Sequence, residues 1–195
     1  MRNFIRFSVL TVFIVLTSCT TIRELSTLSK CEFKIGNIKD LTLVGVNIQK
    51  INSITDLSWG DGAKIAAAIF TSSFPLNFTL NIDVKNPNKT NAALNNLEWI
   101  LLIDDIQMVT GNVNKRVEIA PNGGVSTLPI NINFDLKEAL SGKSFESIKN
   151  FAFNLAGYGS GPTRLTLKAK PTIMIGSKSI QYPGYISIKT QYTSN

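Results

Sequence analysis

The sequence contains no histidine, and this absence removes several common kinds of chemistry. Without histidine the chain cannot form a Ser/His/Asp or Cys/His catalytic set, a histidine-ligated zinc site or a histidine acid–base pair. The glycine-rich segment Gly157–Gly161 matches neither a phosphate-binding loop nor a nucleophile elbow, so we interpret it as a loop. We therefore expect no enzyme activity, no catalytic residues, no cofactor and no metal site.

Charged residues are also scarce, at 17% of the 195 residues, and they form no run along the chain. The formal net charge is +7, from 20 Lys and Arg against 13 Asp and Glu. Arg2 and Arg6 lie in a segment that we expect to be removed, which leaves a charge of +5. Scattered lysines without a basic helix predict a mildly basic solvated surface, and we expect no nucleic-acid partner. The length suits one domain with its own core.

No apolar run reaches the roughly twenty residues that a membrane-spanning helix needs. The run Val9–Leu16 follows Arg2 and Arg6, which is typical of a secretory signal peptide. It ends in Leu16-Thr17-Ser18-Cys19, which resembles the bacterial lipobox: an aliphatic residue, a variable one, a small one and a cysteine. The resemblance implies cleavage before Cys19, a diacylglyceryl group on its thiol and an acylated amino terminus. The alternative is an ordinary signal peptide followed by a chance cysteine.

These features divide the chain into residues 1–18 as a lipoprotein signal peptide, 19–30 as a lipidated tether, 31–190 as one folded domain and 191–195 as a tail. Two or three acyl chains would hold the protein firmly on a membrane. Thr20 is not the aspartate that retains some lipoproteins in the inner membrane, so we expect the outer membrane and its periplasmic face. With Cys19 lipidated, Cys31 has no disulfide partner, and we interpret it as a small apolar residue at a strand start.

The strongest pattern in the chain is an unbroken alternation that ends at Asn86-Pro87-Asn88. Apolar Leu76, Phe78, Leu80, Ile82 and Val84 alternate with polar Asn77, Thr79, Asn81, Asp83 and Lys85. This period of two predicts a strand with one buried face, and the proline and asparagines predict the turn that stops it. We expect Phe78 and Ile82 to be buried, and Asn77 and Asn81 to be exposed or paired at a sheet edge.

Similar patterns predict further strands on both sides of this one. They are expected at Phe33–Ile35, Leu41–Ile48, Leu97–Ile103, Ile106–Gly111, Asn112–Ile119, Thr127–Phe134, Arg164–Ile175 and Ser179–Lys189. The strand Leu97–Ile103 is apolar on both faces, so both should be covered. We interpret Asp104-Asp105 as a solvated hairpin turn instead of a calcium ligand set, and Pro121–Gly124 as a second turn. Pro171 and Pro183 point to sheet edges or bulges.

Two segments have the period of a helix. The first, Ala63–Phe70, follows an expected turn at Trp59–Gly62 with Asp61 as its cap. The second, Phe145–Leu155, carries an apolar stripe that we expect to pack over the sheets or close an open end. Many antiparallel strands with one or two covering helices predict a mainly β fold, an antiparallel sandwich.

The order of these elements resembles the type 2 late-embryogenesis-abundant (LEA) family, whose shared unit is the water-stress and hypersensitive-response domain. The resemblance covers about Phe33 to Lys189, and its sharpest motif is Asp83-Val84-Lys85-Asn86-Pro87-Asn88 after an alternating strand. It implies a fibronectin-III or immunoglobulin-like β-sandwich with a helix, a link to desiccation and stress, and no catalytic residues. The lipobox agrees with bacterial members of that family.

Two functions follow from these observations. The first is a non-catalytic, membrane-anchored lipoprotein domain of the LEA type 2 class, with a binding or structural, stress-protective role in the cell envelope. The alternative is a surface lipoprotein that binds glycan through loop aromatics, with Trp59, Tyr158, Tyr182 and Tyr185 as the speculative ligand surface. The expected partners are the membrane, through Cys19, and an unknown envelope protein or glycan. Exposed aromatics clustered at one end of the sandwich would favour glycan.

Overall fold

The computed structural model describes residues 27–49, 56–139, 162–175 and 177–192. Cys19, Tyr158 and the segment Phe145–Leu155 lie outside the described residues, so the predictions made for them stay predictions. The described chain is mainly β, with antiparallel strand pairs throughout. The strands are β1 (Glu32–Leu43), β2 (Val46–Asn47), β3 (Pro75–Asn86), β4 (Ala92–Leu94), β5 (Asn96–Ile103), β6 (Ile106–Val113), β7 (Val117–Ile119), β8 (Gly124–Asp135), β9 (Thr163–Ile175), β10 (Lys178–Gln181) and β11 (Ile186–Tyr192).

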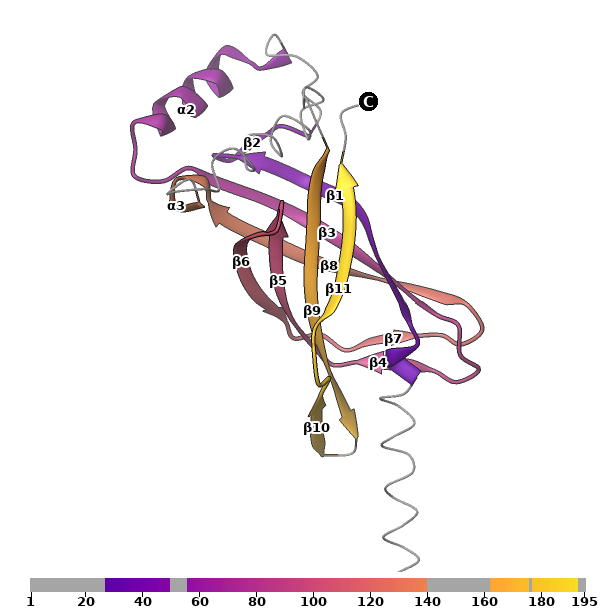
Figure 1. Cartoon of the computed structure of the whole chain (residues 1–195). Helices are drawn as coiled ribbons and strands as arrows, with labels where there is room; N and C mark the ends of the chain where they lie inside the picture. Colours follow the sequence, from indigo (N-terminus) through magenta and orange to yellow (C-terminus); the bar gives the residue numbers. More distant parts are fainter. Residues whose placement is uncertain (1–26, 50–55, 140–161, 176, 193–195) are drawn as a thin grey trace, which may run out of the picture.

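Two larger sheets form the layers of a sandwich (Figure 1). The first sheet has the order β2-β1-β3-β8, and the second has the order β10-β9-β5-β6 with β11 also paired to β9. A small third sheet pairs β4 with β7. Contacts of β1 with β11 and of β6 with β8 join the two layers, and one hydrophobic core lies between them. The predicted fold class, an antiparallel β-sandwich with a few helices, is confirmed.

Strand β3 lies at the centre of the first sheet and follows the predicted alternation. It pairs along its whole length with β8 and, with two irregularities, with β1. Phe78 is 2% exposed and Ile82 is fully buried, as predicted. Asn81 departs from the prediction, because it is only 7% exposed and its Nδ2 donates a 2.8 Å hydrogen bond to Asn37 Oδ1. A polar side chain is tolerated there because its amide has a partner.

The first two predicted strands differ from the strands that the structure contains. The segments Phe33–Ile35 and Leu41–Ile48 were expected to be separate, but β1 runs continuously from Glu32 to Leu43. Its register against β3 shifts between Ile35 and Ile38 and again between Lys39 and Thr42. The prediction placed a break at Gly36-Asn37, but extra residues in one strand can be absorbed as bulges without ending the ladder, so this pair does not mark a turn. The chain turns later, at Val44 and Gly45, where both φ angles are positive.

The last predicted strand, Ser179–Lys189, is also two strands. Both β10 and β11 pair with the same side of β9, one after the other. Pro171 lies in β9 opposite the gap between them, where its carbonyl accepts a 2.9 Å hydrogen bond from the Tyr182 backbone N–H. A proline is tolerated inside this strand, although the strand is paired on both sides. No residue of β10 or β11 lies opposite Pro171, so no ladder hydrogen bond needs the N–H that proline lacks.

The segment Asn112–Ile119 was expected to be one strand, but it divides as well. Strand β6 ends at Val113, and β7 (Val117–Ile119) pairs with β4 away from β6. Strand β4 was not predicted. In β5, Leu102 is buried on the second face and Ile100 is half-buried, so the expectation that both faces are covered holds fully only for Leu102.

The helix α2 spans Trp59–Ile69, so it begins earlier than predicted. The residues expected to form a turn are its first turn, and the N-cap is Ser58 instead of Asp61. The Ser58 hydroxyl accepts a 3.1 Å hydrogen bond from the Asp61 backbone N–H and donates one of 2.7 Å to its carboxylate. Serine, three residues before an acidic side chain, forms this reciprocal cap because both groups reach each other across one turn.

A short helix, α3 (Leu136–Ala139), begins after Asp135, whose carboxylate accepts hydrogen bonds from the backbone N–H groups of Lys137 and Phe74. The Ser73 hydroxyl also donates to this carboxylate. The pKa of Asp135 is lowered, mainly by the hydrogen bond from the Ser73 hydroxyl; desolvation, the second-largest effect, raises it, and the backbone N–H groups lower it further. Asp135 thus ties the start of β3 to the end of β8.

Candidate functional site

The turn Asn86-Pro87-Asn88 has a structural role, as the sequence predicted. Asn86 is 0% exposed, and its Nδ2 donates to the carbonyls of Thr90 at 2.9 Å and Ile119 at 3.0 Å. Its Oδ1 accepts from the backbone N–H and the side-chain amide of Asn88, at 3.1 and 2.8 Å. Asn88 Nδ2 also donates a 3.0 Å hydrogen bond to the Thr27 carbonyl. The buried Asn86 amide therefore connects the end of β3 to β7, and Asn88 extends this network to the start of the described chain.

The proposed aromatic surface is not brought together by the fold. Trp59 is 93% exposed at the beginning of α2, beside a hollow of about 320 Å³ that also includes Leu57 and Ala63. Tyr182 and Tyr185 lie in the connection between β10 and β11. Figure 1 shows α2 at one end of the sandwich and β10 at the other. Trp59 therefore cannot share one ligand with the two tyrosines.

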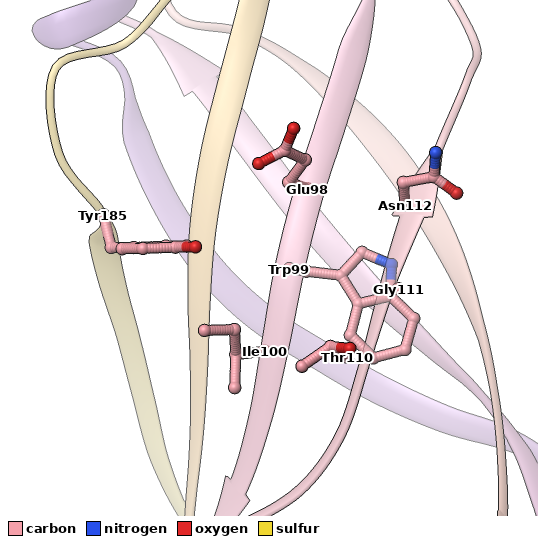
Figure 2. A pocket seen from close by; sticks show the side chains of 7 residues that line it. All are labelled: Glu98, Trp99, Ile100, Thr110, Gly111, Asn112 and Tyr185. Carbon is pink, nitrogen blue, oxygen red and sulfur yellow. The ribbon is translucent and has the colours of Figure 1, made fainter.

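A hollow of about 410 Å³ lies on the outer face of the second sheet, next to Tyr185. The lining residues are Glu98, Trp99, Ile100, Thr110, Gly111, Asn112 and Tyr185 (Figure 2). Strands β5 and β6 form its floor, and the Tyr185 side chain reaches β9 with its hydroxyl on the side of β5. Here a predicted ligand aromatic borders a hollow that is also lined by the polar side chains of Glu98, Thr110 and Asn112.

Strand register explains why these polar side chains meet. Glu98 on β5 lies opposite Asn112 on β6 and opposite Lys170 on β9. Ile100 lies opposite Thr110 in the same way. Directly opposed residues of an antiparallel pair point to the same face, so all five side chains share the outer face of the sheet.

Trp99 contributes to the floor from the core side. It is almost fully buried and lies opposite Gly111, where any Cβ would overlap the Trp99 ring. Glycine at this position lets the indole lie flat against β6, which closes the sheet beneath the hollow. Trp99 is a core residue, as its strand period predicted, and its Nε1 has no hydrogen-bond partner in the described part of the chain.

The two charged side chains at the hollow, Lys170 and Glu98, differ in their contacts. Lys170 Nζ lies 5.7 Å from the centroid of the Tyr185 ring, a cation–π distance, and this contact favours the position of the ring beside the hollow. Glu98 is exposed and makes no ion pair or hydrogen bond with any described residue, although it lies opposite Lys170. The hollow thus has a carboxylate without a described partner next to an exposed aromatic ring.

Sequence reasoning missed Glu98, Thr110, Asn112 and Lys170 as members of one site. Each occupies an outward position of its strand, which the alternation indicates. Which outward residues become neighbours depends on strand pairing and register, and the sequence pattern does not specify either.

The acidic pair Asp104-Asp105 is a turn, in agreement with the prediction. Both residues have positive φ, 48° and 67°, in a two-residue hairpin between β5 and β6. Asp104 Oδ1 accepts a 2.9 Å hydrogen bond from the Arg164 backbone N–H, and Arg164 Nη2 lies 3.1 Å from Asp105 Oδ2. Among the described residues, no three His, Cys, Asp or Glu side chains gather as a metal site would need.

Cys31 is a buried thiol at the start of the domain. Its Sγ donates a weak 3.5 Å hydrogen bond to the Thr27 carbonyl. Burial raises its pKa from 9.0 to about 11, because the thiolate would lose its hydration. The folded state therefore keeps the proton between about pH 9 and pH 11 while the unfolded state loses it, so this group lowers stability as pH rises through that range.

We expect Cys31 to react slowly with thiol reagents in the folded protein. At pH 8 a pKa of about 11 leaves roughly 100-fold less thiolate than the unfolded value of 9.0. The measurement is the rate of reaction with Ellman's reagent in the Cys19→Ser variant, in which Cys31 is the only thiol. The native rate should be at least about 100-fold below the rate in urea. Equal rates would show that the thiol is accessible and ionisable.

No described helix combines the length and apolarity that crossing a bilayer requires. In the comparisons with known proteins, neither a protein-family model nor a curated protein matches the chain.

Three solved structures are similar at low identity. One is the crystal structure of a protein from Archaeoglobus fulgidus, with 13% identity and a TM-score of 0.38, covering 83% of this chain and 98% of that one. The second is the solution structure of a candidate late embryogenesis abundant (LEA) protein, with 12% identity and a TM-score of 0.38, covering 96% and 82%. The third is the X-ray structure of a structural-genomics target, with 7% identity and a TM-score of 0.36, covering 85% and 88%.

Proposed function

We propose that this chain is a non-catalytic binding domain of the LEA type 2 class, held in the cell envelope by lipid on Cys19. The observation that carries the proposal is the lipobox-like Leu16-Thr17-Ser18-Cys19 ahead of a β-sandwich domain. The resemblance of the strand order and of the Asn86-Pro87-Asn88 turn to the LEA type 2 family supports the class and a stress-protective role. The expected location is the outer membrane, facing the periplasm.

The geometry of the described chain is compatible with a short tether. Thr27 is buried and its carbonyl accepts a hydrogen bond from Asn88. The described chain begins beside β4 and β7, at the end of the sandwich away from α2 (Figure 1). The segment from Cys19 to Thr27 can extend over at most about 28 Å. Strand β3, with 12 residues, is roughly 40 Å long. A lipid at Cys19 would keep one end of the domain near the bilayer and leave the sheet faces accessible to partners in the envelope.

A second candidate function, glycan binding, is favoured by one observation. Tyr185 is 47% exposed and borders the hollow that contains Glu98 and Asn112. Glycan-binding sites combine an accessible aromatic ring with polar groups that exchange hydrogen bonds with hydroxyls. This candidate keeps the lipid anchor and assigns the binding role to the outer face of the second sheet.

We expect Cys19→Ser to release the protein from the membrane fraction. The hydroxyl of serine does not receive the lipid, and the sequence shows no other anchor. The measurement is the distribution of the protein between membrane and soluble fractions after a high-salt wash. Cys31→Ala is the matched control, because it removes the other cysteine and should leave the protein in the membrane fraction. Retention of Cys19→Ser in washed membranes would contradict the lipoprotein proposal.

A further inference from the structure

We propose that the hollow beside Tyr185 binds a neutral saccharide, an inference that rests on the proposed role of the chain as a binding domain. The hollow has a volume of about 410 Å³, within the roughly 300–1,000 Å³ typical of small-molecule sites. It is wide enough for sugar rings and open to solvent along the sheet, as an oligosaccharide requires.

An exposed aromatic ring lies beside the hollow. Lys170 Nζ lies 5.7 Å from the centroid of the Tyr185 ring, a cation–π contact that favours this orientation of the ring. In Figure 2 the side chain reaches β9 with its hydroxyl on the side of the strand that carries Glu98 and Ile100. The Tyr185 ring and the half-buried Ile100 give the apolar C–H face of a pyranose a surface to cover.

The polar groups match the hydroxyls of a sugar. The Glu98 carboxylate only accepts hydrogen bonds, Lys170 only donates them, and Asn112 and Thr110 do both. Hydroxyl groups both donate and accept, so a polyhydroxylated ring can use every one of these side chains. Glu98 has no described partner that a ligand would need to displace.

The charges at the hollow favour a neutral sugar over a charged one. An acidic sugar brought to the floor would approach the unpaired Glu98 carboxylate. A cationic sugar would approach Lys170 and also Lys168, which lies opposite Ile100 on the same face. Among the residues that line the hollow, Glu98 is the charged one, so an anionic sugar meets a like charge at the floor, while the two neighbouring lysines offset the attraction of Glu98 for a cationic sugar.

Glycan binding by the full-length protein in detergent tests the inference. The probes are maltotriose, cellotriose and mannotriose as neutral sugars, trigalacturonic acid as an anion and the chitosan trimer as a cation, together with an array of larger neutral glycans. We expect a neutral glycan to bind, and both charged trisaccharides to bind at least about tenfold more weakly. Absence of any neutral binder, or tighter binding of a charged probe, would overturn the inference.

Three variants locate the site. Tyr185→Ala should weaken binding of the best neutral probe about tenfold through loss of the ring surface. Glu98→Gln, which keeps the shape and removes the charge, should weaken it about fivefold. Trp59→Ala is the matched control, because it removes an exposed aromatic from the opposite end of the sandwich and should leave binding unchanged. If only Trp59→Ala loses binding, the glycan binds at α2 and the inference is wrong.

The result separates this inference from the proposed function. If Cys19→Ser is released from the membrane while no neutral glycan binds, the lipid anchor stands and the saccharide inference is wrong. If Cys19→Ser stays in the membrane while a neutral glycan binds, the lipid anchor is wrong and the saccharide site stands.

Discussion

Asn86→Ala is expected to lower the free energy of unfolding by about 3 to 5 kcal/mol. The substitution removes two hydrogen bonds that Asn86 Nδ2 donates and two that its Oδ1 accepts. The Ile119 carbonyl lies in the interior, and a buried polar group left without a partner costs about 1 to 3 kcal/mol. The loss should therefore exceed that of an ordinary surface hydrogen bond. Urea denaturation of the Cys19→Ser form measures it.

Two further variants make the Asn86 experiment specific. Asn131→Ala removes an exposed asparagine of β8 whose Oδ1 accepts from Thr79 at 3.2 Å, and should cost less than about 1 kcal/mol. Asn86→Asp keeps the acceptor oxygens but loses both donated hydrogen bonds and places a carboxylate next to two carbonyls. It should destabilise at least as strongly as alanine at neutral pH and less at low pH, where it is protonated. Equal effects of the two alanine variants would show that the buried amide does not hold this turn.

Phe78→Asp is expected to abolish stable folding, at a cost of about 4 kcal/mol or more. The ring is 2% exposed in the centre of β3, between β1 and β8, and belongs to the core between the two sheets. The substitution creates a cavity and buries a carboxylate without a partner, and the two penalties add. Circular dichroism and urea denaturation of the Cys19→Ser form provide the measurement.

The matched controls test the register of β3. Phe78→Leu keeps an apolar side chain and should cost about 1 to 2 kcal/mol, so the domain stays folded. Asn133→Asp adds the same charge to the exposed face of β8, opposite Asn77, and should change stability by less than about 0.5 kcal/mol. A folded Phe78→Asp domain as stable as Asn133→Asp would show that the inward and outward faces of β3 have been exchanged.

Several features could be predicted because they depend only on neighbouring residues. Alternation placed Phe78 and Ile82 in the core, because successive side chains of a strand point to opposite faces. The Asp104-Asp105 hairpin followed from two residue types that tolerate positive φ between two apolar runs. Asn86 was correctly assigned to a turn, but its burial and its bond to the Ile119 carbonyl join residues 33 positions apart, which no local pattern contains.

Other features required the partner strand. The Gly36-Asn37 pair signals a turn as well as a bulge, and only the continuous ladder of β1 with β3 decides between them. The segment Ser179–Lys189 alternates like one strand, yet its ends pair with different parts of β9 and leave a gap opposite Pro171. Gly60 and Gly62 have low helix propensity, and for this reason the segment was predicted to be a turn. It forms the first turn of α2 because the helical hydrogen bonds outweigh that low propensity.

By itself, the sequence determined the β class of the domain, the inward residues of its long strands and the absence of histidine chemistry, and it predicts the lipid attachment at Cys19. These depend on residue type and local period, which are present in the chain before it folds. The tertiary structure alone decided that Glu98, Asn112 and Lys170 share one face beside Tyr185, and that Trp59 lies at the other end of the sandwich. The physical reason is that strand pairing and register arise from non-local hydrogen bonds and core packing, which bring together side chains that no local sequence pattern connects.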